Sequence, residues 1–253
     1  MKKYRISFQL YSARKFPPIE AHIEALAAIG FDAVEPFGGA YGNDPAGLRK
    51  KLDAAGLACP TAHVALDLLD TDRKAAIGVA EELGLETVVV PYLVAEKRPA
   101  DAAGWKALGA RLAEHAAALA EKGFKLAWHN HDFEYAALPD GSRPIEHLLT
   151  GKGVGFEADI GWIARAGKDA GAETATCGPK IAAFHVKDLA PAGTAVDDGW
   201  TDIGAGTIDW KALLPGIEKS ASDLLVFEHD NPSDWRSFAS RSFAYVSKLV
   251  GRA

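Results

Sequence analysis

Histidine and carboxylate side chains gather at the ends of short apolar segments of this chain. Five of the eight histidines occupy such positions, namely His63, His129, His131, His185 and His229. Carboxylates do the same at Glu35, Glu134, Asp159, Asp188 and Glu228. Neutral imidazoles and carboxylates are ligands for Mn²⁺, Mg²⁺, Co²⁺ or Zn²⁺, and both can transfer protons. The pattern therefore predicts a divalent metal site with proton-transfer groups around it.

Each of these residues also has a purely structural explanation. Taken singly, Asp159 and Glu228 could cap a helix or pair with a cation, but crowded carboxylates repel one another unless a cation lies among them. Glu157 precedes Asp159 by two residues on the same strand face, so we expect it deeper in the fold, paired with a lysine. His229 alternates with Glu228 and is expected to point away from the site.

Strands that end at one rim must position these side chains. Eight strand-like segments alternate with helical patterns, at 4–10, 32–36, 58–64, 86–92, 124–130, 154–159, 181–187 and 223–229. The helical patterns carry start and stop signals, such as Asp44 with Pro45 at the start of one helix and Gly56 at its end. Such an alternation predicts an α/β protein, with residues 1–253 forming one (β/α)₈ TIM-barrel domain. Its active site is then expected at the C-terminal ends of the strands.

The composition narrows the classes of partner. The net charge is −6 and no run is rich in Lys or Arg, which argues against nucleic acid or an anionic membrane as the partner. No segment is apolar over the ~18 residues that a membrane span needs, and the N-terminus lacks the apolar core of a secretion signal. Cys59 and Cys177 suggest neither a disulfide framework nor a thiolate metal site. We therefore expect a cytoplasmic protein that acts on a small molecule, and a homo-oligomer is left open.

Six short motifs follow one another with the spacing of a barrel. They are FQLYSAR (8–14), HNHDFEY (129–135), DIGWIARAG (159–167), FHVKD (184–188), DIGAGTIDW (202–210) and FEHD (227–230). In these motifs the sequence resembles the xylose isomerase-like TIM-barrel superfamily. This is the sugar phosphate isomerase/epimerase group, which includes D-tagatose 3-epimerase and inosose dehydratase. The resemblance covers essentially the whole chain.

By that resemblance one divalent ion is held by four residues, one after each of strands five to eight. Three of them carry over as Asp159, His185 and Glu228. The epimerases have a glutamate at the end of strand five, where this chain has His129. Either His129 is the fourth ligand, or Glu134 curls back from the loop to supply a carboxylate. We favour Glu134, because a hard cation prefers a charged ligand.

The resemblance implies an isomerase or epimerase that acts on a small keto-sugar or cyclitol. In the related epimerases two metal-bound glutamates remove and return a proton next to a ketone, through a metal-stabilised enediolate. Glu228 is one candidate base here, and the second could be Glu134, His131 or His63. The ammonium of Lys187, on the same strand face as His185, could neutralise the oxygen that gains charge.

Lys187 also has a structural alternative, an ion pair with Asp188 or Glu157. The residues expected to contact the substrate are Glu35, His63, Trp162, Asp188 and Trp200. Flat aromatic faces such as those of the two tryptophans can pack against the C–H surface of a sugar. Trp128 is instead expected to pack between helix and barrel. Gly204 and Gly206 indicate a turn that either approaches the ligand or only leads into the next helix.

The expected cofactor is one divalent ion, with Mn²⁺ as the first choice and Mg²⁺, Co²⁺ or Zn²⁺ as alternatives. The competing function is a lyase or dehydratase that uses the same metal site, with His131 as general acid. A non-catalytic sugar-binding barrel is disfavoured, because Asp159, His185 and Glu228 are all present. An unphosphorylated carbohydrate is favoured as the substrate, since no Arg/Ser/Gly phosphate cradle is evident.

Overall fold

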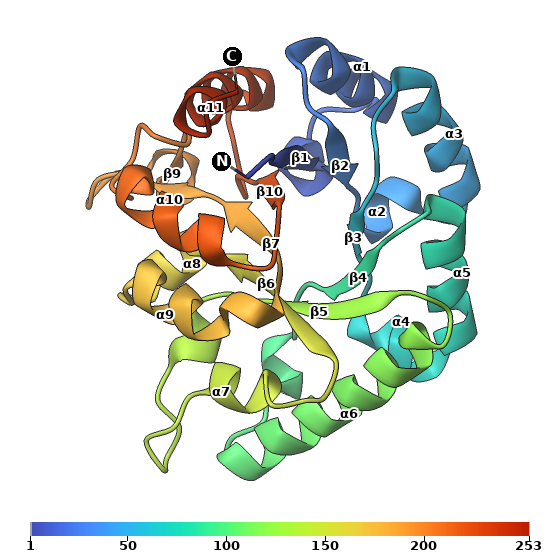
Figure 1. Cartoon of the computed structure of the whole chain (residues 1–253), viewed down its shortest axis with the longest axis vertical. Helices are drawn as coiled ribbons and strands as arrows, with labels where there is room; N and C mark the ends of the chain where they lie inside the picture. Colours follow the sequence, from blue (N-terminus) through green and yellow to red (C-terminus); the bar gives the residue numbers. More distant parts are fainter. Residues whose placement is uncertain (1, 253) are drawn as a thin grey trace.

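The computed structural model describes residues 2–252 and contains the predicted barrel (Figure 1). Its eight parallel strands are β1 (Arg5–Gln9), β2 (Ala33–Glu35), β3 (Thr61–His63), β4 (Thr87–Val90), β5 (Lys125–His129), β6 (Val154–Asp159), β7 (Ile181–Val186) and β10 (Leu224–Phe227). They are hydrogen-bonded in the order β2-β1-β10-β7-β6-β5-β4-β3. Isolated parallel bridges, Ala33 to Ala58 and Phe37 to His63, connect the two ends of this sheet and nearly close the barrel.

Each barrel strand lies within one of the eight segments predicted from the sequence. A further antiparallel pair was not predicted, because its strands are only two residues long: β8 (Asp188–Leu189) and β9 (Trp200–Thr201). This pair belongs to the long connection between β7 and the next helix. The loop therefore has structure of its own above the barrel rim.

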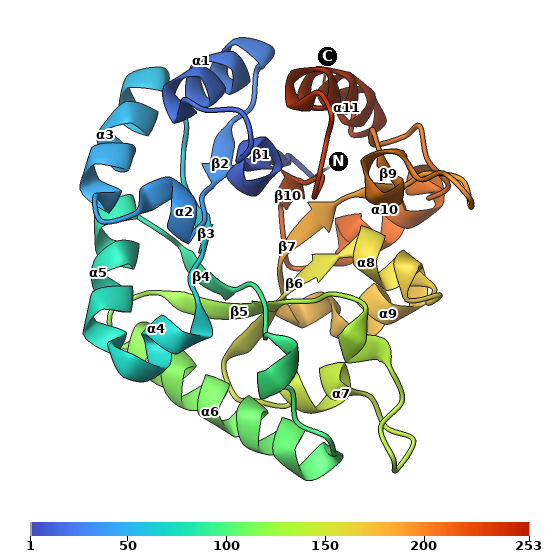
Figure 2. The same ribbon diagram turned by 180° about the vertical axis from the view of Figure 1, so that it is seen from behind.

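Helices surround the strands on the outside, as both ribbon views show (Figures 1 and 2). They are α1 (Ile19–Ile29), α2 (Gly38–Tyr41), α3 (Pro45–Ala55), α4 (Leu66–Thr71), α5 (Arg73–Leu83), α6 (Ala102–Ala120), α7 (Pro144–Leu148), α8 (Ile160–Arg165), α9 (Ala170–Cys177), α10 (Trp210–Lys219) and α11 (Trp235–Leu249). The cap signals of α3 act as predicted: the Asp44 side chain accepts the amide of Gly47, and Gly56 ends the helix at φ 71°. No helix within residues 2–252 combines the length and apolar character of a membrane span.

The side-chain alternation along the strands separates an outer core from an inner one. Outward residues such as Phe8, Phe156 and Phe184 pack against the helices and are buried. The inward residues Ala183, Leu224 and Val226 form a small apolar cluster inside the barrel. Polar residues take over the inward positions towards the C-terminal rim. The interior is therefore apolar at the base and polar at the rim, where the predicted site lies.

Candidate metal centre

The C-terminal ends of the strands surround a pocket of about 790 Å³. Residues from both halves of the barrel line it, among them His63, His129, His131, Trp162, Glu228 and Asp230. Of the residues that we expected to be catalytic or to contact the substrate, the pocket therefore includes His63, His131, Trp162 and Glu228.

Four side chains meet at the base of this pocket with their donor atoms within 4.8 Å of one another. They are His129, Asp159, His185 and Glu228, and all four are buried. His129 Nε2 lies 3.7 Å from Asp159 Oδ2, and His185 Nδ1 lies 3.2 Å from Glu228 Oε2. Parallel pairing of β6 with β7 sets Asp159 beside His185. Two imidazoles and two carboxylates form a mixed N/O donor set suited to a divalent cation.

The environment of Asp159 fits a bound cation. Its Oδ1 accepts the amide of Trp162 at 2.8 Å, whereas its Oδ2 is buried and has no hydrogen-bond partner among the described residues. Burial raises the pKa of Asp159 to about 7, although the nearby charges of Lys187 and His185 act in the opposite direction. A divalent ion between Asp159, His129 and His185 would satisfy this oxygen.

His185 also lies in surroundings that favour a positive charge. Burial by itself would lower its pKa, but the carboxylates of Glu157 and Glu35 raise it well above the usual value. A metal cation on Nδ1 would supply that charge. His129 has the opposite balance: burial and the neighbouring His185 lower its pKa well below the usual value, so its imidazole is neutral and able to act as a ligand.

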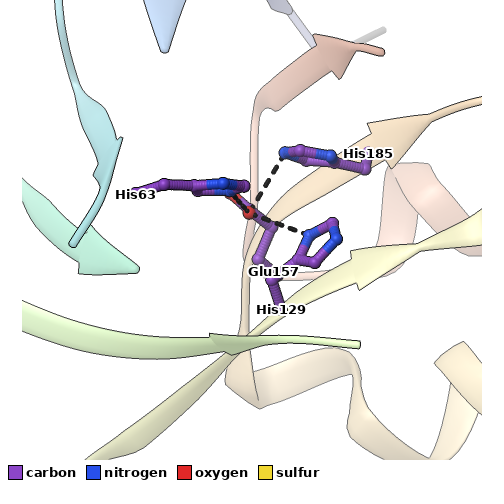
Figure 3. A group of neighbouring side chains, drawn as sticks. All are labelled: His63, His129, Glu157 and His185. Carbon is purple, nitrogen blue, oxygen red and sulfur yellow. Dashed lines mark hydrogen bonds and ion pairs between the residues drawn. The ribbon is translucent and has the colours of Figure 1, made fainter. Parts of the chain in front are cut away.

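A second layer of polar side chains holds the two histidines from below. Glu157 Oε2 lies 2.9 Å from His63 Nε2, 3.1 Å from His185 Nε2 and 3.2 Å from His129 Nδ1 (Figure 3). The expected pairing of Glu157 with a lysine is wrong, because three imidazoles surround this carboxylate oxygen. His129 and His185 thus each direct one nitrogen to Glu157 and the other to the ligand group. Such a contact fixes the tautomer and ring orientation of a ligating histidine.

Glu35 belongs to the same supporting layer. Its Oε1 accepts Gln9 Nε2 at 2.8 Å and lies 2.7 Å from His185 Nε2 and 3.1 Å from His63 Nε2. The side chain is fully buried and does not line the pocket, so the structure does not support the expected contact with substrate. Glu35 and Glu157 together outweigh burial and raise the pKa of His63 to about 9.

Lys187 places a buried ammonium at the edge of the ligand group. Its Nζ lies 2.5 Å from Asp230 Oδ1, 3.2 Å from Glu228 Oε2 and 3.8 Å from Asp159 Oδ2. The ion pair of Lys187 with Asp188 or Glu157, which was the structural alternative, does not form. Burial would lower the pKa of Lys187, but Asp230 and Glu228 raise it above the usual value, so the side chain is charged. Asp230 was missed by the sequence analysis, although it follows Glu228 by two residues in the FEHD motif.

Comparison with known proteins identifies the family to which this fold belongs. A model of the family described as xylose isomerase-like TIM barrel matches residues 23–247. The chain belongs to this family. A search of curated proteins gave no match.

Solved structures of low sequence identity share the family's fold. A sugar phosphate isomerase/epimerase from Parabacteroides distasonis is 18% identical with a TM-score of 0.80, covering 97% of this chain and 94% of that one. The IOLI protein with a bound zinc atom is 17% identical with a TM-score of 0.77, covering 100% and 99%. The probable 3-DHS dehydratase AsbF from Bacillus anthracis is 13% identical with a TM-score of 0.74, covering 98% and 99%.

The structure does not bring Glu134 into the ligand group, although we expected it there. Its Oε1 accepts the indole N–H of Trp128 at 3.0 Å, and its Oε2 accepts the amide of His131 at 2.8 Å. The short 3-10 helix Phe133–Tyr135 turns the side chain away from the pocket and towards the core. Burial raises the pKa of Glu134 to about 8. His129 occupies the strand-five position, so the arrangement favours His129 as the fourth ligand.

Two further residues expected to contact the substrate lie behind the pocket wall. The Asp188 carboxylate accepts the Gly204 amide at 2.8 Å and the Trp210 indole N–H at 2.9 Å, and it organises the segment between β9 and α10. A Cβ at Gly206 would lie 2.2 Å from Asp188 Oδ1. Glycine is therefore needed at this position to make room for the Asp188 carboxylate, and not for a ligand. Trp200 is buried, with its ring edge-on to Trp162 at 5.0 Å and the Lys187 ammonium 4.4 Å from its centroid.

The remaining expectations for aromatic and histidine side chains agree with the structure. Trp128 is fully buried in the core, as expected. His229 points away from the site and packs against Phe238, with ring centroids 5.2 Å apart. Tyr11 and Tyr92 also line the pocket and were not predicted from the sequence. Their position directly after β1 and β4 is the signal that could have found them.

Proposed function

We propose that the protein is a divalent-metal-dependent isomerase or epimerase of a keto-sugar or cyclitol. The observation that carries this proposal is the ligand group of His129, Asp159, His185 and Glu228 beneath a pocket large enough for a small molecule. Membership of the xylose isomerase-like family and the fold shared with a sugar phosphate isomerase/epimerase support it.

The residues divide between holding the ion and moving protons. His129, Asp159, His185 and Glu228 would hold the ion, which when bound would supply Lewis-acid stabilisation to the oxygens of the substrate. Glu228 lines the pocket as well as belonging to the ligand group, so its carboxylate can reach a carbon next to the ketone. We assign to it the removal of that proton. Lys187 lies beside Glu228 and supplies fixed positive charge where negative charge develops.

His131 is the best placed partner for the opposite face of the substrate. Its ring lines the pocket and its Nδ1 is buried without a hydrogen-bond partner among the described residues. Burial lowers the pKa of His131 to about 3, so the imidazole is neutral but only weakly basic, and its position in the pocket is what supports the assignment. His63 is less suited to the role of base, because its Nε2 contacts Glu157 and Glu35.

The lyase or dehydratase remains the second candidate, because it would begin with the same proton removal. Elimination requires one step more, the protonation of a leaving group by a general acid, which is why we rank it below isomerisation. The two outcomes differ in their products, since elimination releases a leaving group and isomerisation does not.

Proton exchange in D₂O tests the proposal. Metal-loaded protein is incubated with a panel of ketoses, inososes and 3-keto-glycosides, and the loss of the C–H signal is followed by proton NMR. We expect exchange that stops when EDTA removes the metal. Exchange of no member of the panel, with metal shown to be bound, would contradict the proposed function.

A further inference from the structure

The pocket above the metal centre has two chemically unlike halves. Strands β5, β6, β7 and β10, with the loops after them, form the polar half, whose pocket residues include His129, His131, Glu228 and Asp230. The loops after β1 to β4 contribute a wall that includes Tyr11, Phe37, Leu68, Pro91 and Tyr92. All the ligands of the candidate metal centre lie on strands of the polar half or directly after them. The second half, which we call the apolar wall, therefore has no role in holding the ion.

The apolar wall contains aromatic rings that stay partly exposed to solvent. Among the described residues only four large hydrophobic side chains are exposed, and Tyr11 at 37% and Tyr92 at 44% are two of them. Both line the pocket. Large exposed apolar surface beside a polar site is typical of a ligand-binding surface.

The rings of the wall are held in place by their neighbours. Tyr11 meets Phe37 edge-on with ring centroids 5.2 Å apart, and Tyr92 meets His131 edge-on at 5.0 Å. The Phe37 ring lies so close to Gly39 that a Cβ there would be 2.5 Å from it. The guanidinium of Arg14 stacks 3.6 Å from the Tyr11 ring centroid. The wall is therefore a preformed surface for a flat apolar group, which lowers the entropic cost of binding one.

The size of the pocket leads to the same conclusion. Its volume of about 790 Å³ lies in the range of ~300–1,000 Å³ that is usual for drug-sized ligands. A single sugar ring is much smaller than such a ligand. A ring whose oxygens reach the metal centre would occupy the polar half and leave the apolar wall facing water.

We propose that the substrate is a keto-sugar that carries a flat apolar substituent, as in an aryl glycoside, and that the apolar wall binds this substituent. This inference rests on the proposed function for the identity of the sugar part. The apolar wall itself can be tested without any turnover.

Paired ligands that differ only in the substituent provide the test. The metal-loaded protein is titrated by calorimetry with methyl and phenyl glycosides of glucose and galactose, as both anomers. We expect the phenyl compound of at least one pair to bind ~10-fold more tightly or better, because its ring is removed from water against the wall. Equal affinities within every pair, or no detectable binding of any phenyl glycoside at millimolar concentration, would overturn the proposal.

Variants of the wall show where the substituent binds. We expect Tyr92→Ala and Phe37→Ala each to reduce the phenyl-to-methyl preference at least ~3-fold, as stacking on one aromatic ring is worth roughly this much. Val94→Ala is the matched control, since Val94 is 45% exposed on the same loop but does not line the pocket. A preference that survives both wall variants, or that Val94→Ala also removes, would refute the assignment.

The two proposals can fail separately. A phenyl preference that depends on Tyr92 and Phe37, without exchange of any substrate proton, would contradict the proposed function and support the apolar wall. Proton exchange without a phenyl preference would support the proposed function and contradict the apolar wall.

Discussion

Asp159 Oδ2 lies 3.7 Å from His129 Nε2, and both side chains are buried at the C-terminal rim of the barrel. This oxygen has no hydrogen-bond donor among the described residues. The pair therefore has the character of two ligands that share an ion and not of a structural hydrogen bond.

Removal of a ligand should weaken metal binding. Asp159→Ala and His185→Ala are each expected to lower the affinity for the divalent ion by at least ~10-fold. Loss of a residue that binds the ion should reduce metal affinity at least as much as loss of a residue that only orients a ligand. Metal content is measured by elemental analysis after dialysis. Asp132→Ala is the control, because Asp132 is exposed in the neighbouring loop and lies outside the ligand group. Wild-type metal content in both ligand variants would refute the site.

Glu157 is predicted to act as a positioning residue for both histidine ligands. In Glu157→Gln we expect metal affinity to fall by ~10- to 100-fold, the range usual for residues that orient a ligand. The amide can still accept one hydrogen bond, so the fold is retained. Nitrogen NMR of the imidazoles is the specific readout: His129 and His185 should each lose the single tautomer of the wild type. Unaltered tautomers in the variant would contradict the assigned role.

The fold and the inward-facing ligands could be predicted from the sequence because they depend on local pattern. Alternation along β6 and β7 is enough to point Asp159 and His185 to the same side, and family motifs give the order of the strands. The orientation of Glu134 could not be predicted, since it depends on a single 3-10 turn that brings its carboxylate to Trp128. The partners of Glu157 depend on the register of strands far apart in sequence.

The buried carboxyl of Glu134 should make stability depend on pH. Its pKa is about 8 in the folded protein, above the ordinary value of 4.5 for a glutamate, so between these values the unfolded state binds fewer protons. Stability then falls as pH rises from about 5 to 8. Glu134→Gln removes this loss, so the variant should gain stability relative to the wild type over that range, by on the order of 1–3 kcal/mol.

Urea unfolding of both EDTA-treated proteins at pH 5 and pH 8 measures this change. A stability difference between wild type and Glu134→Gln that is the same at pH 5 and pH 8 would count against the raised pKa of Glu134. Metal content of Glu134→Gln should equal that of the wild type, because Glu134 lies outside the ligand group. Loss of metal from Glu134→Gln would show that Glu134 is a ligand after all.

Asp188 is predicted to stabilise the segment between β9 and α10 and not to bind substrate. Asp188→Ala leaves the buried indole N–H of Trp210 and the amide of Gly204 without their acceptor, which should cost roughly 2–5 kcal/mol of unfolding free energy. Asp53→Ala removes an exposed carboxylate paired with Arg49 and should cost less than about 1 kcal/mol. Urea unfolding measures the loss of unfolding free energy in both variants. A loss in Asp188→Ala as small as that in Asp53→Ala would show that Asp188 has no such structural role.

Glu228 is predicted to be both a ligand and the base that removes the substrate proton. Glu228→Gln keeps an oxygen for the ion but has no basic carboxylate. The most direct test follows the exchange of the substrate C–H with D₂O by NMR for metal-loaded wild type and Glu228→Gln, with metal content and substrate affinity measured in parallel. We expect the variant to hold metal and substrate and to exchange at least ~100-fold more slowly, as is usual for loss of a general base. Exchange at the wild-type rate by a variant that binds both normally would contradict proton transfer by Glu228.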